Sequence, residues 1–434
     1  MDQPNSTFTD ADLSNGVTYY YRISAVDETG NESAYSDEAS ATPISAVIPA
    51  QTWTQLNPTG GLPAKRSGHS AVYNASTNRM IVFGGCVGAN IVSAPSVLND
   101  VWVLENADGM GGTPAWHQLT PTGPSPSARA YHPAVYDPTT NRMIVFGGNP
   151  RVGYCRGTTN DIWVLEHADG LGGTPAWHSL SPTSATGTPP GVRNLHCAVY
   201  DPDTNRLMVF GGQDACESDK NDVWVLEHAN GLGGIPNWIL LNPVGGAPVG
   251  RSAHSAVYDP GSNRMIIYGG AYPYKGDVWA LENANGLGGT PNWIELLPDG
   301  TDPIRIGHTA VYQASTNRMI VFGGGDTSAR KNDVWVLNNA NGVSGTPTWT
   351  ELDPTGTSLD NRVDHTAVYN PATKRMIILG GSNCTAGCYD LDDVWVLAPD
   401  LVVAVPEISL SADSYDFGEV HLGASSDWTL TVSN

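Results

Sequence analysis

The sequence predicts an all-β fold, a closed ring of six four-stranded blades, because one block of residues recurs six times along the chain. Each block ends an apolar run with two glycines and continues, after a loop, with Asp, a β-branched residue and Trp. The second glycines lie 54 to 64 residues apart, which is too long for repeats of paired helices and fits four strands per repeat. The apolar runs are short and bounded by Gly, Pro, Asn and Asp, which is typical of strands joined by turns.

The first repeat shows where its four strands are expected. Residues 69–73 (HSAVY) alternate in polarity, 80–85 (MIVFGG) are apolar throughout, and 100–105 (DVWVLE) and 115–119 (AWHQL) each carry a Trp. The turns after the first and third segments are rich in Asn, Asp and Gly, as hairpin turns require. Four antiparallel strands per repeat, arranged radially, make a β-propeller.

Tryptophan positions predict how the ring closes. Six Trp belong to the Asp-x-Trp strands and six begin a fourth strand, but Trp395 has no fourth strand after it and Trp53 has no blade before it. We therefore expect residues 53–56 to pair with residues 394–397 and supply the outer strand of the last blade. Closing the ring in this way removes a free sheet edge.

These motifs resemble kelch-repeat β-propellers over residues 52 to about 398. The Gly-Gly that ends the second strand, the Asp-x-Trp and the later Trp carry the resemblance. Residues 13–43, through Leu13, Gly16, Tyr19 and Tyr21, resemble the last strands of a fibronectin type III domain, and residues 406–434 resemble the opening strands of an immunoglobulin-like domain. The expected domains are thus 1–43, a linker at 44–51, the propeller at 52–400 and an incomplete sandwich at 401–434, cut from a longer protein.

Charge and cysteine content limit the function classes. The net charge is −22, which argues against nucleic acid as a partner, and no apolar run approaches the length of a membrane span. Six cysteines without metal-ligand spacing favour an oxidising, extracellular or cell-surface setting, with any export signal outside this segment. Cys384 and Cys388 are expected to form a local disulfide, and weaker expectations join Cys86 to Cys155 and Cys197 to Cys216.

Loop lengths point to one face of the ring. The spacing across strands one and two is 15 residues in all six repeats, whereas the distance from the second Gly to the next Trp varies from 9 to 17. Strands alternate in direction, so the 2–3 loops and the 4–1 loops share a face, and recognition loops diverge where scaffold turns do not. Candidate ligand-binding residues in the 2–3 loops are Arg151, Tyr154, Arg156, Tyr272, Tyr274, Lys275 and Tyr389.

Two sets of residues recur at the start of the first strand. Each of six arginines stands three residues before a histidine: Arg66, Arg129, Arg193, Arg251, Arg305 and Arg362 precede His69, His132, His196, His254, His308 and His365. Six guanidinium groups at the channel mouth could bind an anionic ligand, or each could pair with the Asp of a neighbouring Asp-x-Trp and lock the blades together. The histidines are expected to be structural.

A non-catalytic binding or adhesion module is the preferred function, with a protein or glycan ligand and no cofactor. The alternative is an oxidase resembling galactose oxidase, which implies copper ligands of two Tyr and two His, a Tyr–Cys thioether and seven blades. That ligand set cannot be assembled from non-repeating residues of this sequence, and no nucleophile elbow or pair of catalytic carboxylates is present.

Overall fold

The protein is described here by a computed structural model. It describes residues 51–88, 96–150, 157–185, 187–214, 218–271, 273–383 and 388–398, together with 8–10, 17–22, 24, 31–32, 34–35, 38–41, 408–410 and 432–433. The chain divides into two compact units, Gln51–Pro399 and a second one made of Met1–Ala50 with Asp400–Asn434. Each unit is described by itself.

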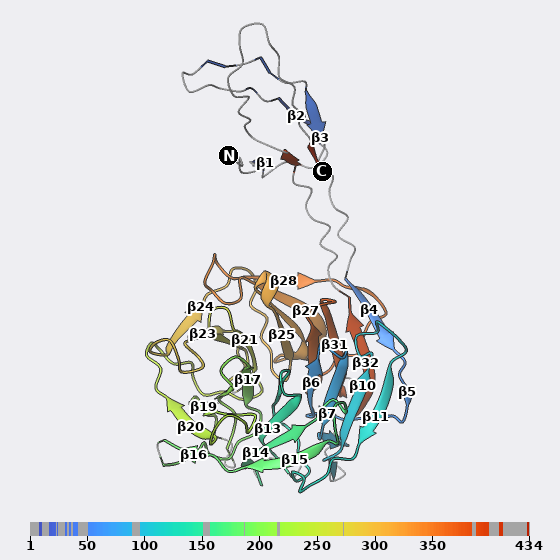
Figure 1. The fold of residues 1–434 in the computed structure, drawn as a ribbon, viewed down its shortest axis with the longest axis vertical. Helices are drawn as coiled ribbons and strands as arrows, with labels where there is room; N and C mark the ends of the chain where they lie inside the picture. Colours follow the sequence, from blue (N-terminus) through green and yellow to red (C-terminus); the bar gives the residue numbers. More distant parts are fainter. Residues whose placement is uncertain are drawn as a thin grey trace. The chain divides into compact units, whose positions relative to one another are not determined.

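Residues 51–399 form six antiparallel four-stranded sheets, the expected all-β six-bladed propeller (Figure 1). Blades 1 to 3 consist of β6 (Ser70–Asn74), β7 (Arg79–Phe83), β10 (Val101–Glu105) and β11 (Ala115–Leu119); β12 (Ala134–Asp137), β13 (Arg142–Gly148), β14 (Thr159–Glu166) and β15 (Ala176–Leu180); and β17 (Cys197–Asp201), β18 (Arg206–Phe210), β19 (Val223–Glu227) and β20 (Asn237–Leu241). Blades 4 to 6 consist of β21 (Ser255–Asp259), β22 (Arg264–Tyr268), β23 (Val278–Glu282) and β24 (Asn292–Leu296); β25 (Thr309–Gln313), β26 (Arg318–Gly325), β27 (Arg330–Asn338) and β28 (Thr348–Leu352); and β30 (Thr366–Asn370), β31 (Arg375–Asn383), β32 (Tyr389–Leu397) and β4 (Thr52–Leu56). The first strands of neighbouring blades contact one another around the centre.

The ring closes as the tryptophans predict. β4 pairs antiparallel with β32, with Leu56 opposite Val394 and Trp53 opposite Leu397. The chain then crosses to the next blade, where β5 (Thr59–Gly60) pairs in parallel with the outer strand β11. In the same way, β16 (Thr183–Ser184) pairs with β20, the outer strand of blade 3. β29 (Thr355–Gly356) pairs with β4, the outer strand of blade 6. These short segments satisfy hydrogen-bonding groups that an outer strand would otherwise expose.

The remaining elements are short. β8 (Cys86–Val87) and β9 (Ser96–Val97) form a small hairpin in the 2–3 loop of blade 1, and η1 (Ala314–Thr316) is a single 3₁₀ turn between β25 and β26. In the second unit, β1 (Phe8–Asp10) pairs with β33 (Ile408–Leu410), which pairs with β34 (Val432–Ser433), and β2 (Tyr19–Tyr21) pairs with β3 (Ala39–Ala41). The two ends of the chain therefore share one sheet, while the fibronectin-like and immunoglobulin-like assignments and the domain limits stay predictions.

Apolar side chains pack between blades. Each of six buried clusters joins two neighbouring blades, so that every interface has its own core. At most interfaces the Trp of the outer strand packs on an aromatic ring of the preceding blade, as Trp177 does on Phe83 with ring centroids 5.0 Å apart. Trp53 makes the same contact with Phe322 across the last interface, at 5.1 Å. The closing strand is thus part of the core as well as of a sheet.

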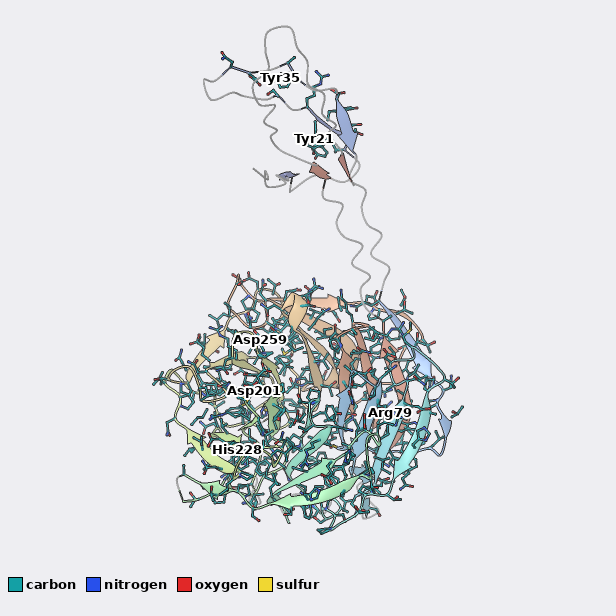
Figure 2. All side chains as sticks on the ribbon, in the orientation of Figure 1. Tyr21, Tyr35, Arg79, Asp201, His228 and Asp259 are labelled. Carbon is teal, nitrogen blue, oxygen red and sulfur yellow. The ribbon has the colours of Figure 1, made fainter. Side chains whose placement is uncertain are left out.

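We call the face that carries the 1–2 and 3–4 turns the lower face, and complementary polar pairs join its blades. The 3–4 turn of one blade meets the 1–2 turn of the preceding blade, and each pair has one carboxylate and one amide: Asp108 with Asn370, Asp169 with Asn74, Asn230 with Asp137, Asn285 with Asp201, and Asn341 with Asp259. Arg79, Asp201 and Asp259, labelled in Figure 2, belong to the 1–2 hairpins of three blades. Arg79 also donates to the carbonyl of Asp169 in the next blade. This network explains why the lower turns keep a constant length.

Candidate binding face and central channel

The 2–3 loops and the 4–1 loops share the opposite face, as the alternating strand directions predict; we call it the upper face. Asn160 at the start of β14 donates its side-chain amide to the carbonyl of Pro190, in the loop that leads to the next blade, at 2.9 Å. Asn332 makes the equivalent bond to the carbonyl of Leu359 at 2.7 Å. The loops of variable length are therefore neighbours in space.

The arginine ring lies at the upper end of the inner strands, but its charges are already paired. Arg66 Nη1 and Nη2 each lie 2.8 Å from one carboxylate oxygen of Asp100, and Nη1 also donates to the carbonyl of Gly84. Bidentate pairs recur at Arg129, Arg193, Arg251 and Arg362. Arg305 lies against Asp333 with its Nε and one carboxylate oxygen unpartnered. All six side chains are buried, so the structure gives them a structural role instead of an open anion site.

The arginines lock the blades by a different route from the one expected. Each pairs with the Asp-x-Trp of its own blade, because strands one and three both flank strand two and the long arginine side chain reaches past the end of strand two. The link to the preceding blade comes from the backbone: the Arg66 N–H donates to the carbonyl of Leu391, and the N–H of Gly381 donates to the carbonyl of Arg66. Burial alone would raise the pKa of Asp161, but hydrogen bonds from Arg129 and its charge outweigh burial and hold that pKa at about 2.

The histidine ring is structural, as expected. In five of the six blades, the Nε2 atom of the imidazole lies near the residue that follows the histidine of the preceding blade, for example 3.0 Å between His132 and the Ser70 hydroxyl. The same contact joins His254 to Cys197, His308 to Ser255, His365 to Thr309 and His69 to Thr366. The exception is His196, which faces the blade of Pro133 and has neither ring nitrogen partnered. Burial lowers the pKa of all six imidazoles and keeps them neutral.

A closed circle of peptide hydrogen bonds forms the waist of the channel. The residue before each histidine donates its N–H to the carbonyl of the equivalent residue in the preceding blade, with N···O distances of 2.7–3.0 Å. The six members are Gly68, Tyr131, Leu195, Ala253, Gly307 and Asp364. All have left-handed backbone, with φ between 52° and 60°. Non-glycine residues pay a conformational cost there, so the surrounding blades hold this geometry in place.

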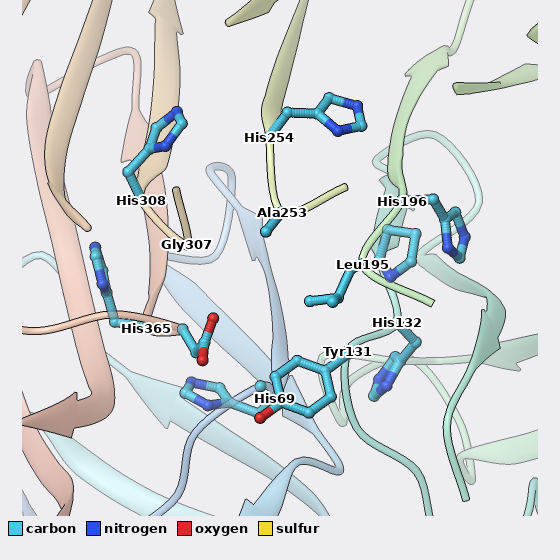
Figure 3. Close-up of a pocket in the computed structure, with 13 residues that line it drawn as sticks. His69, Tyr131, His132, Leu195, His196, Ala253, His254, Gly307, His308 and His365 are labelled. Atoms are coloured by element: carbon cyan, nitrogen blue, oxygen red, sulfur yellow. The ribbon is translucent and has the colours of Figure 1, made fainter. Parts of the chain in front are cut away.

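A cavity of about 140 Å³ lies in the channel, lined by the waist residues, the six histidines and Pro133. Tyr131 and Leu195 extend into its middle, while the imidazoles lie around its wall (Figure 3). A Cβ on Gly68 would lie 2.9 Å from the ring of Tyr131, and one on Gly307 would lie 3.0 Å from a carboxylate oxygen of Asp364. The two glycines therefore make room for the side chains of the following blades.

The predicted loop residues differ in accessibility. Arg151, Tyr154, Arg156 and Tyr272 lie outside the described residues. Tyr274 is half-buried, and Lys275 is buried with its Nζ donating to the carbonyl of Pro273, so Lys275 is not a free loop cation. Tyr389 is 44% exposed, accepts from the Asn383 amide at 3.1 Å and lies 3.3 Å from Asp360. Of the expected loop residues that can be placed, Tyr389 is the one that a ligand can reach most readily.

Two of the expected disulfide partners are free thiols. Cys86 and Cys197 are buried and unbridged, so the expected Cys86–Cys155 and Cys197–Cys216 disulfides are wrong. Cys86 lies beside Ser67 of its own blade, whereas Cys197 lies beside His254 of the next blade and takes part in a contact between blades. Cys388 is disulfide-bonded, and its expected partner Cys384 lies outside the described residues.

Sequence reasoning missed the side chains that line the channel. The residue before each histidine is Gly, Tyr, Leu, Ala, Gly and Asp in the six blades, although the flanking Arg, His, Ala, Val and Tyr of the same segment never change. That break in the repeat was a visible signal. Among the described residues, no group of three or more His, Cys, Asp or Glu side chains could hold a metal ion, and no helix is long and apolar enough to cross a membrane.

A family model for the KLHDC2/KLHL20/DRC7 Kelch-repeats domain matches residues 44–183 and 234–402. The chain belongs to the kelch-repeat family. Its relatives include the host cell factor homolog hcf-1 of Caenorhabditis elegans, 28% identical over 305 residues, which cover 63% of this chain and 37% of that protein. The F-box/kelch-repeat protein At1g51550 of Arabidopsis thaliana is 27% identical over 240 residues, 50% of this chain and 46% of that protein. The kelch chain thus spans less than half the length of these relatives.

Among solved structures, the kelch chain is similar to one titled "Structure of YjhT". The TM-score is 0.52 at 14% sequence identity, and the match covers 87% of this chain and 99% of that one. At this identity the likeness supports the propeller fold alone.

Proposed function

We propose that this kelch propeller is a non-catalytic binding module that recognises a protein partner with its upper face, around the mouth of the channel. The difference between the two faces carries the proposal. Lower turns are constant in length and joined blade to blade by the same polar pair, whereas upper loops vary in length and present a different side chain at each blade. Specific recognition needs non-repeating groups, and the upper loops differ from blade to blade in both length and sequence.

Exposed apolar side chains on the upper face favour a protein over a glycan. Val249 and Ile304, just before the arginines at the upper end of the inner strands, are 61% and 40% exposed, and Tyr389 adds an aromatic ring. Protein interfaces bury such groups at their centre, with polar groups around them. The lower face also exposes apolar side chains, mostly at one repeated turn position (Met110, Leu171, Leu232, Leu287 and Val343), with Ile235 in addition. The kelch family and a relative named as an F-box/kelch-repeat protein agree with an interaction role.

A peptide library displayed on phage tests this proposal. We expect peptides selected on the whole chain to bind at least tenfold more weakly to a Tyr389→Ala variant, and equally well to a Met110→Ala control on the lower face. Both changes affect exposed or half-exposed side chains and should leave the melting temperature within a few degrees. Loss of binding in the Met110→Ala variant alone would place the site on the lower face and contradict the proposal. Binding to a glycan array with no peptide selected would replace the protein partner by a carbohydrate.

We also propose that the protein works in an oxidising, extracellular or cell-surface setting. The disulfide at Cys388 supports this, because such bonds persist where thiols are not kept reduced. Mass spectrometry after non-reducing digestion of protein from its native source should show Cys388 joined to Cys384. A free Cys388 thiol in that material would remove the support for this setting.

A further inference from the structure

The residues of the channel waist differ from blade to blade, although the residues around them are repeated. Around it, every blade contributes the same Arg, His, Ala, Val and Tyr, but the six waist positions carry two glycines and four different side chains. Three of them, Tyr131, Leu195 and Asp364, are large or charged and line one cavity. Scaffold packing would favour a repeated small residue here, so these three positions need another explanation.

The backbone at the waist makes these side chains costly. Left-handed φ values of 57°, 52° and 55° at Tyr131, Leu195 and Asp364 are unfavourable for residues with a Cβ, whereas glycine adopts them without strain. Glycine stands at two other waist positions, and there the missing Cβ leaves space for Tyr131 and for the Asp364 carboxylate. Ring and carboxylate are thus accommodated by residues of neighbouring blades, which is the arrangement of a built site.

The half-buried Asp364 carboxyl group lines the cavity. Its backbone takes part in the waist circle, but within the described part of the chain its side chain makes no hydrogen bond or ion pair. Burial raises the pKa of Asp364 to about 6; the charge of Arg330 in β27 opposes this, and that of Asp390 in β32 adds to it. The surrounding histidines are neutral, and the Cys86 thiol, whose pKa burial raises, is neutral as well. The cavity therefore holds a carboxyl group whose charge is poorly compensated.

We propose that the channel cavity binds an aliphatic ammonium group, the side chain of a lysine on the protein partner or a free alkylamine. The ammonium would pair with the Asp364 carboxylate, the ring of Tyr131 would add a cation–π contact, and Leu195 and Pro133 would contact the methylene stem. A cavity of about 150 Å³ admits a molecule as large as benzene, so 140 Å³ accepts a four-carbon stem with its ammonium. The lysine source rests on the proposed function; the ammonium site itself does not.

Calorimetric titration of the whole chain with n-butylammonium, with n-butanol as the neutral control, tests the site. We expect n-butylammonium to bind in preference to n-butanol and Asp364→Asn to weaken this binding at least tenfold. Asp392→Asn, which changes a partly exposed carboxylate in β32, should have no effect. Because Asp364 must be ionised, affinity should rise about tenfold from pH 5 to pH 7 and lose this dependence in Asp364→Asn. Equal binding of amine and alcohol, or an unchanged affinity in a folded Asp364→Asn variant, would overturn the site.

The source of the ammonium is decided by a second titration with Nα-acetyl-lysine amide and its norleucine analogue. Binding of the lysine compound alone assigns a partner's lysine, whereas binding of n-butylammonium without it assigns a free amine. The selected peptides separate the two proposals. Peptides that bind the upper face while n-butylammonium fails leave the proposed function standing and remove the channel site, and ammonium binding with no peptide selected does the reverse.

Discussion

At the lower face, each hydrogen-bonded pair between a 3–4 turn and the preceding blade joins one carboxylate to one amide. Asn230 donates to Asp137 at 2.7 Å, and the equivalent pair Asp169–Asn74 has the two chemistries exchanged at 2.9 Å. In both arrangements the 3–4 turn residue also accepts the N–H two residues later, from Leu232 or Leu171. Either order therefore satisfies the same hydrogen bonds, provided that one partner is a carboxylate and the other an amide.

Asn230→Asp should lower the free energy of unfolding by about 1–3 kcal/mol, because two buried carboxylates would face each other without a donor. Adding Asp137→Asn should restore most of the loss, since the double variant reproduces the Asn74–Asp169 pair. Urea unfolding of the two single variants and the double variant measures the coupling. If the two losses simply add, the pairs do not act as units.

Pro133 is a second single-residue effect, in the channel wall. Proline lacks an N–H, and β12 accordingly begins one residue later than the first strands of other blades; it also lacks the hydroxyl that His196 would need. Pro133→Ser should raise the free energy of unfolding by about 1 kcal/mol, because the new hydroxyl would give the unpartnered His196 imidazole a buried hydrogen bond. This gain should outweigh the loss of about 0.4–1 kcal/mol that arises when the unfolded chain becomes more flexible without the proline. Thermal unfolding beside the control Pro138→Ser, in an exposed 1–2 turn, checks this. A lower melting temperature for Pro133→Ser than for the control would contradict it.

At the scale of elements, the closing strand β4 is the one blade strand that does not follow the strand it pairs with along the chain. Its Trp53 is buried against Phe322, so Trp53→Ala should cost about 3–5 kcal/mol, and deleting residues 1–57 should lower the melting temperature further by opening the edge of β32. Gln55→Ala, an exposed position on the same strand, serves as the control and should change stability by less than about 0.5 kcal/mol. A deletion variant that melts at the wild-type temperature would show that β4 does not close the ring.

Blades, closure and loop faces were predictable because each rests on a pattern that recurs along the chain, such as the two unpaired tryptophans at its ends. The waist was not predicted, because nothing in the local sequence around Tyr131 or Asp364 signals left-handed backbone at a non-glycine residue. Arg66 was ambiguous for another reason: its own Asp100 and the Asp393 of the preceding blade are both compatible with the spacing. Cysteine pairing could not be read from sequence at all, since it depends on which thiols, like Cys197, face a blade interface.

At the scale of the whole molecule, the six buried histidines make the ring sensitive to acid. Burial is the largest cause that lowers the pKa of each imidazole, to about 3 for His132 and His308, so the folded state stays unprotonated where the unfolded chain, with a pKa near 6.5, takes up protons. Stability from these groups is fully present above pH 6.5 and is lost as the pH falls below it. Asp364 acts in the opposite direction, because its raised pKa favours the folded state as pH falls through about 6.

Each imidazole should contribute a loss of about 1.4 kcal/mol per pH unit between pH 6 and pH 4, and this sum exceeds the single opposing proton of Asp364. The free energy of unfolding, measured in urea at pH 7.5, 6.5, 5.5 and 5.0, should therefore fall ever more steeply below pH 6.5. His196→Gln tests the cause, since His196 makes no hydrogen bond that the change would break, and it should reduce the slope by about one proton. His178→Gln, at an exposed position on the outer strand β15 where the imidazole contacts Glu166, serves as the comparison and should change the slope less than His196→Gln. A stability that stays flat down to pH 5 would mean that the imidazoles become protonated within the folded ring.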